Sequence, residues 1–379
     1  MQYRKFGNTG LEISALGFGC MRLPTTIGEE INEEKAIEMI RYGIDNGVNY
    51  IDTAYMYHEY KSENLVGKAL QDGYREKVYL ATKCPVFMMD SGDEFEKILD
   101  EQLDKLQTSY VDFYLLHSLF DESWEDKVIK WNLIEKMEKA KAEGKIKHIG
   151  FSFHDDYDTF KKIIDYYDKW EFCQIQMNYV DVNRQATLEG MKYAADKGLG
   201  VIVMEPLLGG KLSNLPTRVA ECFTEEKTQT QWALEFLWDK PEVSFLLSGM
   251  SSLQHVMENV ESAKNSSIGC VKEEDKERYV KAKDIFINSA LVGCTKCSYC
   301  MPCPFGLDIP RIFEIYNKLP TSSGKGKFLK EYNTLEVKAD ACQKCQVCES
   351  VCPQHLAIST LMEEVHKAFS EINPNIEED

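Results

Sequence analysis

The chain has 379 residues, 44% of them hydrophobic, and carries a formal net charge of −18. This length is enough for one large core and a smaller second domain, and the negative charge argues against nucleic acid as a partner because phosphates would be repelled. The sequence has neither an apolar run of about 18 residues nor an apolar segment near its start, so we expect no membrane span, no signal peptide and a cytoplasmic location.

The first 262 residues alternate short apolar runs with stretches of helical period, which is the pattern of βα units. Residues 3–6 and 11–13 are predicted to form an N-terminal β-hairpin around a turn at 7–10. Eight further strands are predicted at 16–19, 50–53, 78–82, 111–116, 146–151, 173–177, 200–204 and 243–247. Helices are predicted between them, and those at 33–46, 131–142 and 185–196 are each followed closely by a glycine.

Eight strands that are each followed by a helix predict an α/β fold of the (β/α)8 TIM barrel type. The alternative is an open doubly wound sheet, which normally has G-x-G-x-x-G after its first strand. This chain lacks that motif at its first predicted strand, so the barrel is favoured.

A second domain is predicted near the C-terminus, where eight of the 13 cysteines gather. We assign residues 1–265 to the barrel, 266–290 to a helical linker and 291–379 to a small, mainly helical, ferredoxin-like domain. The cysteines form two runs, each a C-x-x-C-x-x-C group followed by Cys-Pro: Cys294, Cys297, Cys300 and Cys303, then Cys342, Cys345, Cys348 and Cys352.

Three closely spaced cysteines, with a fourth from a Cys-Pro elsewhere, are the ligand pattern of a [4Fe–4S] cluster. Because the Cys-Pro of each run usually serves the other cluster, we predict two clusters. Cluster 1 has the ligands Cys294, Cys297, Cys300 and Cys352, and cluster 2 has the ligands Cys342, Cys345, Cys348 and Cys303. The domain resembles a two-cluster bacterial-type ferredoxin, although the first run has two residues rather than three before its Cys-Pro.

Two other uses of these cysteines fit less well. Zinc would need paired C-x-x-C groups, commonly about a dozen or more residues apart. Disulfides need an oxidising compartment, which nothing in the sequence indicates. The other five cysteines are predicted to be buried thiols.

Four polar residues follow predicted strands of the barrel: Asp52, Tyr57, Lys83 and His117. Barrel enzymes carry their chemistry at the C-terminal ends of the strands, so neighbouring strands would bring these side chains together. A lysine cation lowers a tyrosine pKa from its usual value of about 10, an aspartate holds the lysine, and a neutral histidine can hydrogen-bond a carbonyl oxygen. Each residue alone is more often a packing residue or part of an ordinary ion pair, but the set suits proton donation to a carbonyl that receives a hydride.

At these residues the chain resembles the aldo/keto reductase family, over roughly residues 1–262. The motifs that carry the resemblance are Asp52-Thr53-Ala54-Tyr55-Met56-Tyr57, Ser62-Glu63-Asn64-Leu65-Val66-Gly67, Thr82-Lys83 and Leu115-Leu116-His117. The resemblance implies an enzyme in which Tyr57 is the general acid, Lys83 and Asp52 tune it, and His117 orients the carbonyl. With the cysteine-rich tail, residues 150–154 and 204–211 resemble the branch of the family that has a C-terminal 4Fe–4S ferredoxin-type domain.

The resemblance also implies an NAD(H) or NADP(H) cofactor across the barrel mouth. The implied residues are Gly19, Cys20, Met21 and Asp52, then Ser152 and Gln174 at the carboxamide, Met204 and Leu207, Gly209 and Lys211 at the pyrophosphate, and Gly249, Ser251, His255, Glu258 and Asn259 on the adenosine side. Many NADPH users have Lys and Arg where this chain has Gly249 and His255, which favours NADH. Two further departures from the family pattern are Phe153 in place of Asn and Met204 in place of an aromatic ring.

The substrate implied is a small carbonyl or alcohol compound. Apolar side chains near the mouth favour an apolar or aromatic compound, or else only pack the loops: Met56, Phe87, Met88, Leu119, Phe120 and Trp124. A hydride carries two electrons and a cluster accepts one, a mismatch that a bound flavin could resolve, although no flavin motif is found. The clusters are therefore interpreted in three ways: as a wire, which is a path for electron transfer to a redox partner protein, as a brace, which holds the tail in place structurally, or as a redox sensor. A regulatory subunit with little turnover is a further alternative, and the oligomeric state stays open.

Overall fold

The computed structural model of the chain describes residues 1–26, 30–287, 291–319 and 325–372. The chain divides into two compact units, of which the first comprises 1–207 and 226–275 and the second 208–225 and the residues from 276 onwards. The domain limits that the sequence predicts, with a linker at 266–290, stay a prediction, and 288–290 lie outside the described residues. None of the described helices is both long enough and apolar enough to span a bilayer.

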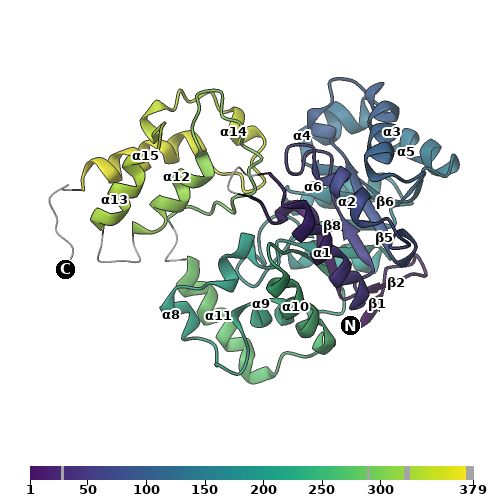
Figure 1. The fold of residues 1–379 in the computed structure, drawn as a ribbon, viewed down its shortest axis with the longest axis horizontal. Coiled ribbons are helices and arrows are strands. Elements are labelled where there is room, and N and C mark those ends of the chain that lie inside the picture. The colour runs from purple at the N-terminus through teal and green to yellow at the C-terminus, as the bar shows by residue number, and fades with distance from the viewer. Residues whose placement is uncertain (27–29, 288–290, 320–324, 373–379) are drawn as a thin grey trace. The chain divides into compact units, whose positions relative to one another are not determined.

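The first unit contains a closed barrel of eight parallel strands, which confirms the predicted fold class (Figure 1). Neighbouring strands follow one another in the chain, and the last strand pairs with the first to close the barrel. The strands are β3 (Leu16–Gly19), β4 (Tyr50–Asp52), β5 (Tyr79–Cys84), β6 (Val111–Leu119), β7 (Ile146–Phe153), β8 (Phe172–Gln176), β9 (Gly200–Met204) and β10 (Phe245–Gly249). An antiparallel hairpin of β1 (Tyr3–Lys5) and β2 (Glu12–Ser14) precedes them, as predicted.

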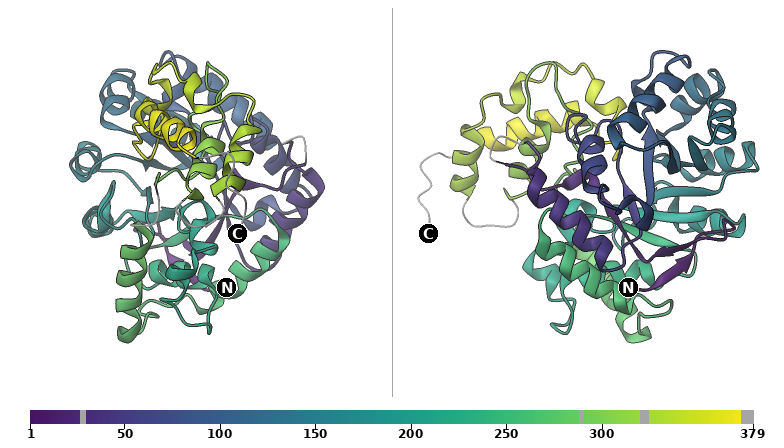
Figure 2. Two further views of the ribbon diagram at one scale, coloured as in Figure 1. Left: turned by 90° about the vertical axis from the view of Figure 1, so that its left-hand side faces the viewer. Right: turned by 45° about the vertical axis from the view of Figure 1, so that its right-hand side comes forward.

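Helices surround these strands (Figure 2). They are η1 (Cys20–Arg22), α1 (Glu33–Asp45), α2 (Ser62–Ala69), η2 (Arg75–Lys77), η3 (Val86–Met88), α3 (Glu94–Leu106), α4 (Asp121–Ser123), η4 (Trp124–Ile129), α5 (Leu133–Ala142), α6 (Tyr157–Tyr166), α7 (Thr187–Asp196), α9 (Gln229–Trp238), α10 (Leu253–Ser262) and η6 (Ala263–Asn265). Helix α1 shows why they pack: Ala36, Ile40 and Ile44 recur on one face and are buried, while the Asn32 side chain caps the helix by accepting from the amide of Lys35 at 3.2 Å.

The hairpin places a phenylalanine in the N-terminal end of the barrel. The Phe6 ring lies 5.2 Å from the ring of Phe113 and 5.5 Å from that of Phe245. Glycine is required beside it, because a Cβ on Gly200 would lie 2.3 Å from the Phe6 ring. This end of the barrel is therefore filled by packed aromatic side chains, and the chemistry is left to the opposite end.

The second unit is helical in its described residues. Its elements are η5 (Leu208–Ser213), α8 (Thr217–Ala220), α11 (Glu273–Ile287, which begins at the edge of the first unit), α12 (Ile309–Tyr316), α13 (Lys325–Asn333), η8 (Ala339–Ala341), α14 (Val347–Ser350) and α15 (Ile358–Ser370). Its core includes Phe313 and Met362, and the Tyr332 ring stacks on the Phe369 ring with 4.1 Å between centroids. The mainly helical character that the sequence predicts for this region is confirmed.

Candidate functional site

The C-terminal ends of β4, β5 and β6 bring the four predicted catalytic residues together. The ammonium of Lys83 donates to Asp52 Oδ1 at 2.6 Å, to the carbonyl oxygen of Thr53 at 2.7 Å and to the Tyr57 hydroxyl at 3.3 Å. The Tyr57 ring lies 6.0 Å from the ring of His117. All four side chains are buried, and Lys83 is 0% exposed. The three donors of one lysine thus connect the aspartate to the tyrosine.

Burial sets the charge states in this cluster. Burial lowers the pKa of Lys83 and raises that of Asp52, and each of the two charges opposes the shift of the other. Since they form a hydrogen-bonded pair at 2.6 Å, the ammonium and carboxylate stabilise each other as ions. Burial, together with the positive charges of Lys83 and His154, holds the pKa of His117 well below its usual value. His117 is therefore neutral at pH 7 and has a ring N–H to donate.

A second layer of buried polar groups lies behind Lys83 and has no role assigned from the sequence. Glu63 Oε1 accepts from the Thr82 hydroxyl at 2.6 Å and from Gln102 Nε2 at 2.7 Å. The same Gln102 nitrogen lies 3.0 Å from the carbonyl oxygen of Lys83, and Gln102 Oε1 accepts from the Tyr114 hydroxyl at 2.7 Å. This network holds β5 at Thr82 and at the backbone carbonyl of Lys83. The one signal in the sequence was a polar residue, Gln102, among apolar neighbours on the buried face of α3.

Two predicted carboxamide-binding residues lie side by side on neighbouring strands. Ser152 of β7 and Gln174 of β8 are paired in register. The Ser152 hydroxyl accepts from the amide of Ser118 at 2.7 Å, and Gln174 Nε2 lies 3.3 Å from the sulfur of Met204. Gln174 Oε1 is buried and has no hydrogen-bond partner among the described residues. A carboxamide N–H would satisfy this acceptor, so these residues fit a nicotinamide.

The ends of β3 and β10 place the predicted adenosine-side residues. Gly249 pairs with Gly19, and the carbons of Arg22 lie 3.3 Å from the position of a Cβ on Gly249. The amide of Ser251 donates to His255 Nδ1 at 3.4 Å within its own loop and helix. Two others are engaged as well: Asn259 of α10 donates to the Ser248 hydroxyl of β10 at 3.1 Å, and Glu258 accepts from Gln254 of its own helix at 2.6 Å.

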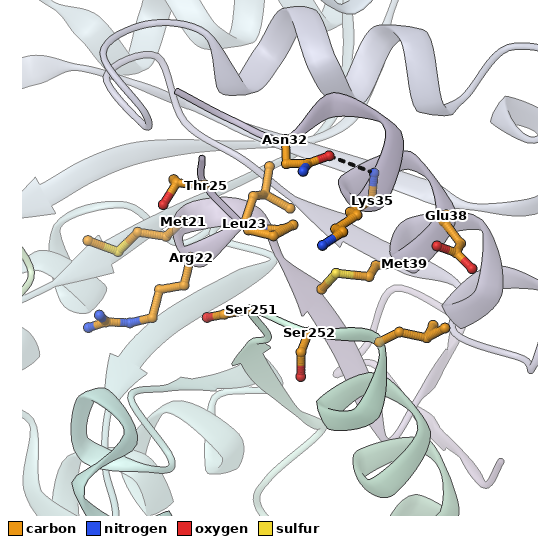
Figure 3. A pocket seen from close by; sticks show the side chains of 12 residues that line it. Met21, Arg22, Leu23, Thr25, Asn32, Lys35, Glu38, Met39, Ser251 and Ser252 are labelled. Carbon is orange, nitrogen blue, oxygen red and sulfur yellow. Dashed lines mark hydrogen bonds between the residues drawn. The ribbon is translucent and has the colours of Figure 1, made fainter. Parts of the chain in front are cut away.

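A cavity of about 650 Å³ opens beside these residues (Figure 3). It is lined by Met21 and Arg22 of η1, by Lys35 of α1 and by Ser251 and Ser252 before α10. Figure 3 shows the Lys35 side chain directed into the cavity. Both cations, Arg22 and Lys35, come from the N-terminal region and not from the Gly249 and His255 positions on which the preference for NADH rests.

Cys20 and Asp52 lie at the ends of β3 and β4, and Leu207 is the last residue of the first unit before its interruption. Gly209 and Lys211 lie in η5, which belongs to the second unit. Their predicted contact with the pyrophosphate stays a prediction.

The second unit brings together the four cysteines that were assigned to cluster 1. Cys294, Cys297, Cys300 and Cys352 line one cavity whose walls include Ile309, Phe313 and Ile358. Burial and the neighbouring thiols raise the pKa of Cys300. Among the residues that the structure describes, no three potential ligands converge as a single metal ion would require, whereas a cube binds each thiolate at a different iron. An apolar cavity with four converging cysteines fits such a cube.

The two cysteine runs share their backbone conformation around the second cysteine. Lys296 and Ser298, which flank the second cysteine of the first run, have φ of 57° and 64°. Lys344 and Gln346, at the equivalent positions of the second run, have φ of 55° and 62°. In both runs a helix, α12 or α15, begins six residues after the Cys-Pro cysteine. The second unit therefore contains an internal repeat, as expected if each run forms one cluster site.

The second run is the more open of the two. Cys345 is exposed, and Val347 beside it is 55% exposed. Burial, Glu349 and the thiols of Cys342 and Cys345 raise the pKa of Cys348 to about 11. The part of Cys303 as their fourth ligand stays a prediction.

A parallel barrel with a buried lysine between an aspartate and a tyrosine at its mouth defines a barrel oxidoreductase. Residues 15–269 match the family model "Aldo/keto reductase family", and residues 293–357 match the model "4Fe-4S dicluster domain". The chain belongs to the aldo/keto reductase family, is an NAD(P)-dependent oxidoreductase and carries an iron–sulfur domain, which confirms both resemblances seen in the sequence.

Similar proteins agree with this assignment. The chain is 31% identical over 283 residues to "L-galactose dehydrogenase" of Arabidopsis thaliana, covering 69% of this chain and 87% of that protein. It is similar in structure to "aldo-keto reductase AKR11C1 from Bacillus halodurans", with a TM-score of 0.64 and 26% identity over 74% of this chain and 96% of that one. An aldo-keto reductase of Klebsiella pneumoniae in complex with NADPH has the same fold, with a TM-score of 0.62 and 22% identity over 76% of this chain and 96% of that one.

Proposed function

We propose that the chain reduces a small carbonyl compound with NADH or NADPH and that Tyr57 is the general acid. The observation that carries this proposal is the buried Lys83 ammonium, which is hydrogen-bonded to both Asp52 and Tyr57. A positive charge 3.3 Å from the phenol oxygen favours loss of the phenolic proton. The proposal is that this proton passes to the carbonyl oxygen as the hydride reaches the carbon.

Each protein group has one task in the reaction. The dihydronicotinamide, when bound, supplies the hydride. Tyr57 donates its proton to the oxygen that becomes the alcohol, and Lys83 stabilises the phenolate that remains. Asp52 keeps Lys83 charged and oriented. The neutral His117 donates a hydrogen bond to the carbonyl oxygen and so positions it between the acid and the hydride donor.

The proposal also assigns residues to each part of the nicotinamide cofactor. Ser152 and Gln174 hold the carboxamide, and Gln174 Oε1 gains the partner that it otherwise lacks among the described residues. The adenosine end lies towards the Ser251 cavity. Two [4Fe–4S] clusters are held by the ligand sets given above, with Cys352 and Cys303 exchanged between the runs.

Electron transfer through the clusters is a second candidate function. It is favoured by the repeat of the two cysteine runs, since a brace needs one site, and by the exposure of Cys345, which suits exchange with a partner protein. A flavin would then be needed to divide the electron pair of the hydride. In this case the carbonyl site and the clusters would act in one pathway.

One pair of experiments tests these proposals. The Tyr57→Phe variant should lose carbonyl reduction by a factor of about 100 or more while its affinity for the nicotinamide cofactor is unchanged. Turnover that survived in this variant would show that another group is the acid.

The second experiment is an anaerobic purification with measurement of absorbance, iron and released flavin before and after addition of NAD(P)H. Bleaching of the clusters on addition of NAD(P)H would support electron transfer through the clusters. Clusters that stay oxidised while an added aldehyde is reduced would support a carbonyl reductase with a structural or sensory tail.

A further inference from the structure

The segment that follows the catalytic lysine is held by a second lysine. Residues 85–93 connect β5 to α3, directly after Lys83 and Cys84. The ammonium of Lys127 lies 3.2 Å from the carbonyl oxygen of Val86, 3.1 Å from that of Phe87 and 2.9 Å from that of Met89. All three N–H donors of one ammonium are therefore used on one short segment.

A carboxylate holds the second half of the same segment. Glu94 Oε2 accepts from the amide of Asp90 at 2.8 Å and from that of Ser91 at 3.2 Å. A cation thus binds the carbonyl groups at the start of the segment and an anion binds the amides at its end. Because charge-assisted hydrogen bonds are about twice as strong as neutral ones, this pair specifies the path of the backbone.

Other groups around Lys127 also hold its ammonium in place. It lies 5.4 Å from the Trp131 ring, and the carboxylates of Asp90 and Glu94 are near enough to favour its charged form. It sits in η4, a six-residue π-helical turn that is anchored by the buried Trp124 and Val128. Such turns are rare and frequently occur at functional sites. The turn presents Lys127 to the segment after β5.

The segment carries a ring to the catalytic histidine. The Phe87 ring lies 5.5 Å from the ring of His117, on which Tyr57 also packs at 6.0 Å. The residues next to it are anchored: Val86 is buried, and the sulfur of Met89 lies 3.5 Å from that of Cys84. Phe87 is therefore the side chain of this segment that reaches the place where His117 would orient a carbonyl.

We propose that Lys127 is a positioning residue that fixes Phe87 as an apolar wall of the carbonyl site. This inference rests on the proposed function and deepens it, because it names the substrate class: aldehydes or ketones with an aryl or bulky apolar group on the carbonyl carbon. The ring of such a group packs against Phe87, while a small aldehyde does not reach it. Lys127 acts through the backbone of 86–89 and touches neither substrate nor cofactor.

Steady-state kinetics with two aldehydes test the inference. Wild type, Lys127→Met and Phe87→Ala are compared on benzaldehyde and acetaldehyde, with Lys130→Met as the matched control, since Lys130 is an exposed lysine three residues further along the chain. We expect Lys127→Met to raise the KM for benzaldehyde about tenfold and to change kcat/KM for acetaldehyde less than twofold. Phe87→Ala should raise the KM for benzaldehyde by a similar factor, and the double variant should be no worse on benzaldehyde than either single one.

Three outcomes would contradict the inference. Equal losses on both aldehydes in Lys127→Met would mean a general structural role and would overturn the inference. Additive effects of the two substitutions would overturn it as well, because the lysine would then act on something other than Phe87. A wild-type chain that reduced neither aldehyde would overturn the proposed function and this inference with it, and so the two failures are distinguishable.

Discussion

Removing Lys83 should expose how strongly the active-site pair depends on both of its members. Lys83 is 0% exposed and Asp52 is 1% exposed, and their charged atoms are 2.6 Å apart. At an effective dielectric constant of about 20, this separation corresponds to an attraction of about 6 kcal/mol, much of which is offset by the cost of burying both charges. The Lys83→Met variant leaves Asp52 as a buried unpaired carboxylate, so it should lower the free energy of unfolding by about 3–5 kcal/mol at pH 8.

The loss of unfolding free energy in the Lys83→Met variant should be larger at high pH than at low pH. Burial already raises the pKa of Asp52 in the folded chain, and removal of the lysine cation raises it further. A carboxyl whose folded pKa exceeds its unfolded value of about 4 stabilises the fold below that value, and this stabilisation is lost as the pH rises through the folded pKa. The Lys83→Met variant should therefore be less destabilised at pH 5 than at pH 8, because Asp52 can bind a proton.

Urea unfolding followed by tryptophan fluorescence provides the assay. All five tryptophans belong to the first unit, so the signal reports the barrel: Trp124, Trp131, Trp170, Trp232 and Trp238. Asp52→Asn and the double variant complete the cycle. We expect the double variant to lose clearly less than the sum of the single ones and to lose the pH dependence. Additive losses that do not vary between pH 5 and pH 8 would refute the assignment of a coupled ion pair.

Three further outcomes are expected. Gly200→Ala should destabilise the barrel by about 1–3 kcal/mol in the same unfolding assay, because its Cβ would lie 2.3 Å from the Phe6 ring; an unchanged midpoint would mean that the ring has room to move. Cys352→Ser should remove cluster 1 and about half of the iron measured after anaerobic purification; full iron content would contradict the exchange of ligands between the runs. Lys35→Met should weaken NADPH about fivefold in a fluorescence titration and NADH hardly at all, because an exposed lysine contributes about 1 kcal/mol to a phosphate contact; equal weakening would place Lys35 elsewhere than at the 2′-phosphate.

The fold was predictable because its signals are local. Each barrel strand is a short apolar run and each helix a stretch of period 3.6, and the glycines after α1, α5 and α7 mark where those helices end. Two helices begin two residues later than predicted, at Leu133 and Thr187, because left-handed backbone at Asn132 and Gln185, with φ of 52° and 55°, interrupts the predicted helical stretch. The register of the closed barrel, which pairs β10 with β3, joins segments more than 200 residues apart and could be inferred only from the strand count.

The candidate catalytic residues stand out in the sequence for a different reason than the groups that position them. Asp52, Lys83 and His117 stand out because polar residues interrupt or follow apolar strands. Gln102 and Lys127 lie on helices, where polar residues are common, and their roles depend on which backbone carbonyl groups they reach. Nothing in a single sequence specifies such a contact. The same holds for the cations beside the Ser251 cavity, which come from elements far from α10 in the chain.

The buried pair at the barrel mouth is better explained by chemistry than by stability. A well-packed apolar pair in place of a buried ion pair is often neutral for the fold, or even stabilising. Here Lys83 also donates a hydrogen bond to the Tyr57 hydroxyl, and an apolar side chain in its place could not make this bond. The network of Glu63, Gln102 and Thr82 also positions the backbone of this lysine rather than the charge of the aspartate. A double variant such as Asp52→Asn with Lys83→Met should thus recover much of the stability and none of the turnover, which is the combination expected if the pair is retained to hold a positive charge at the acid.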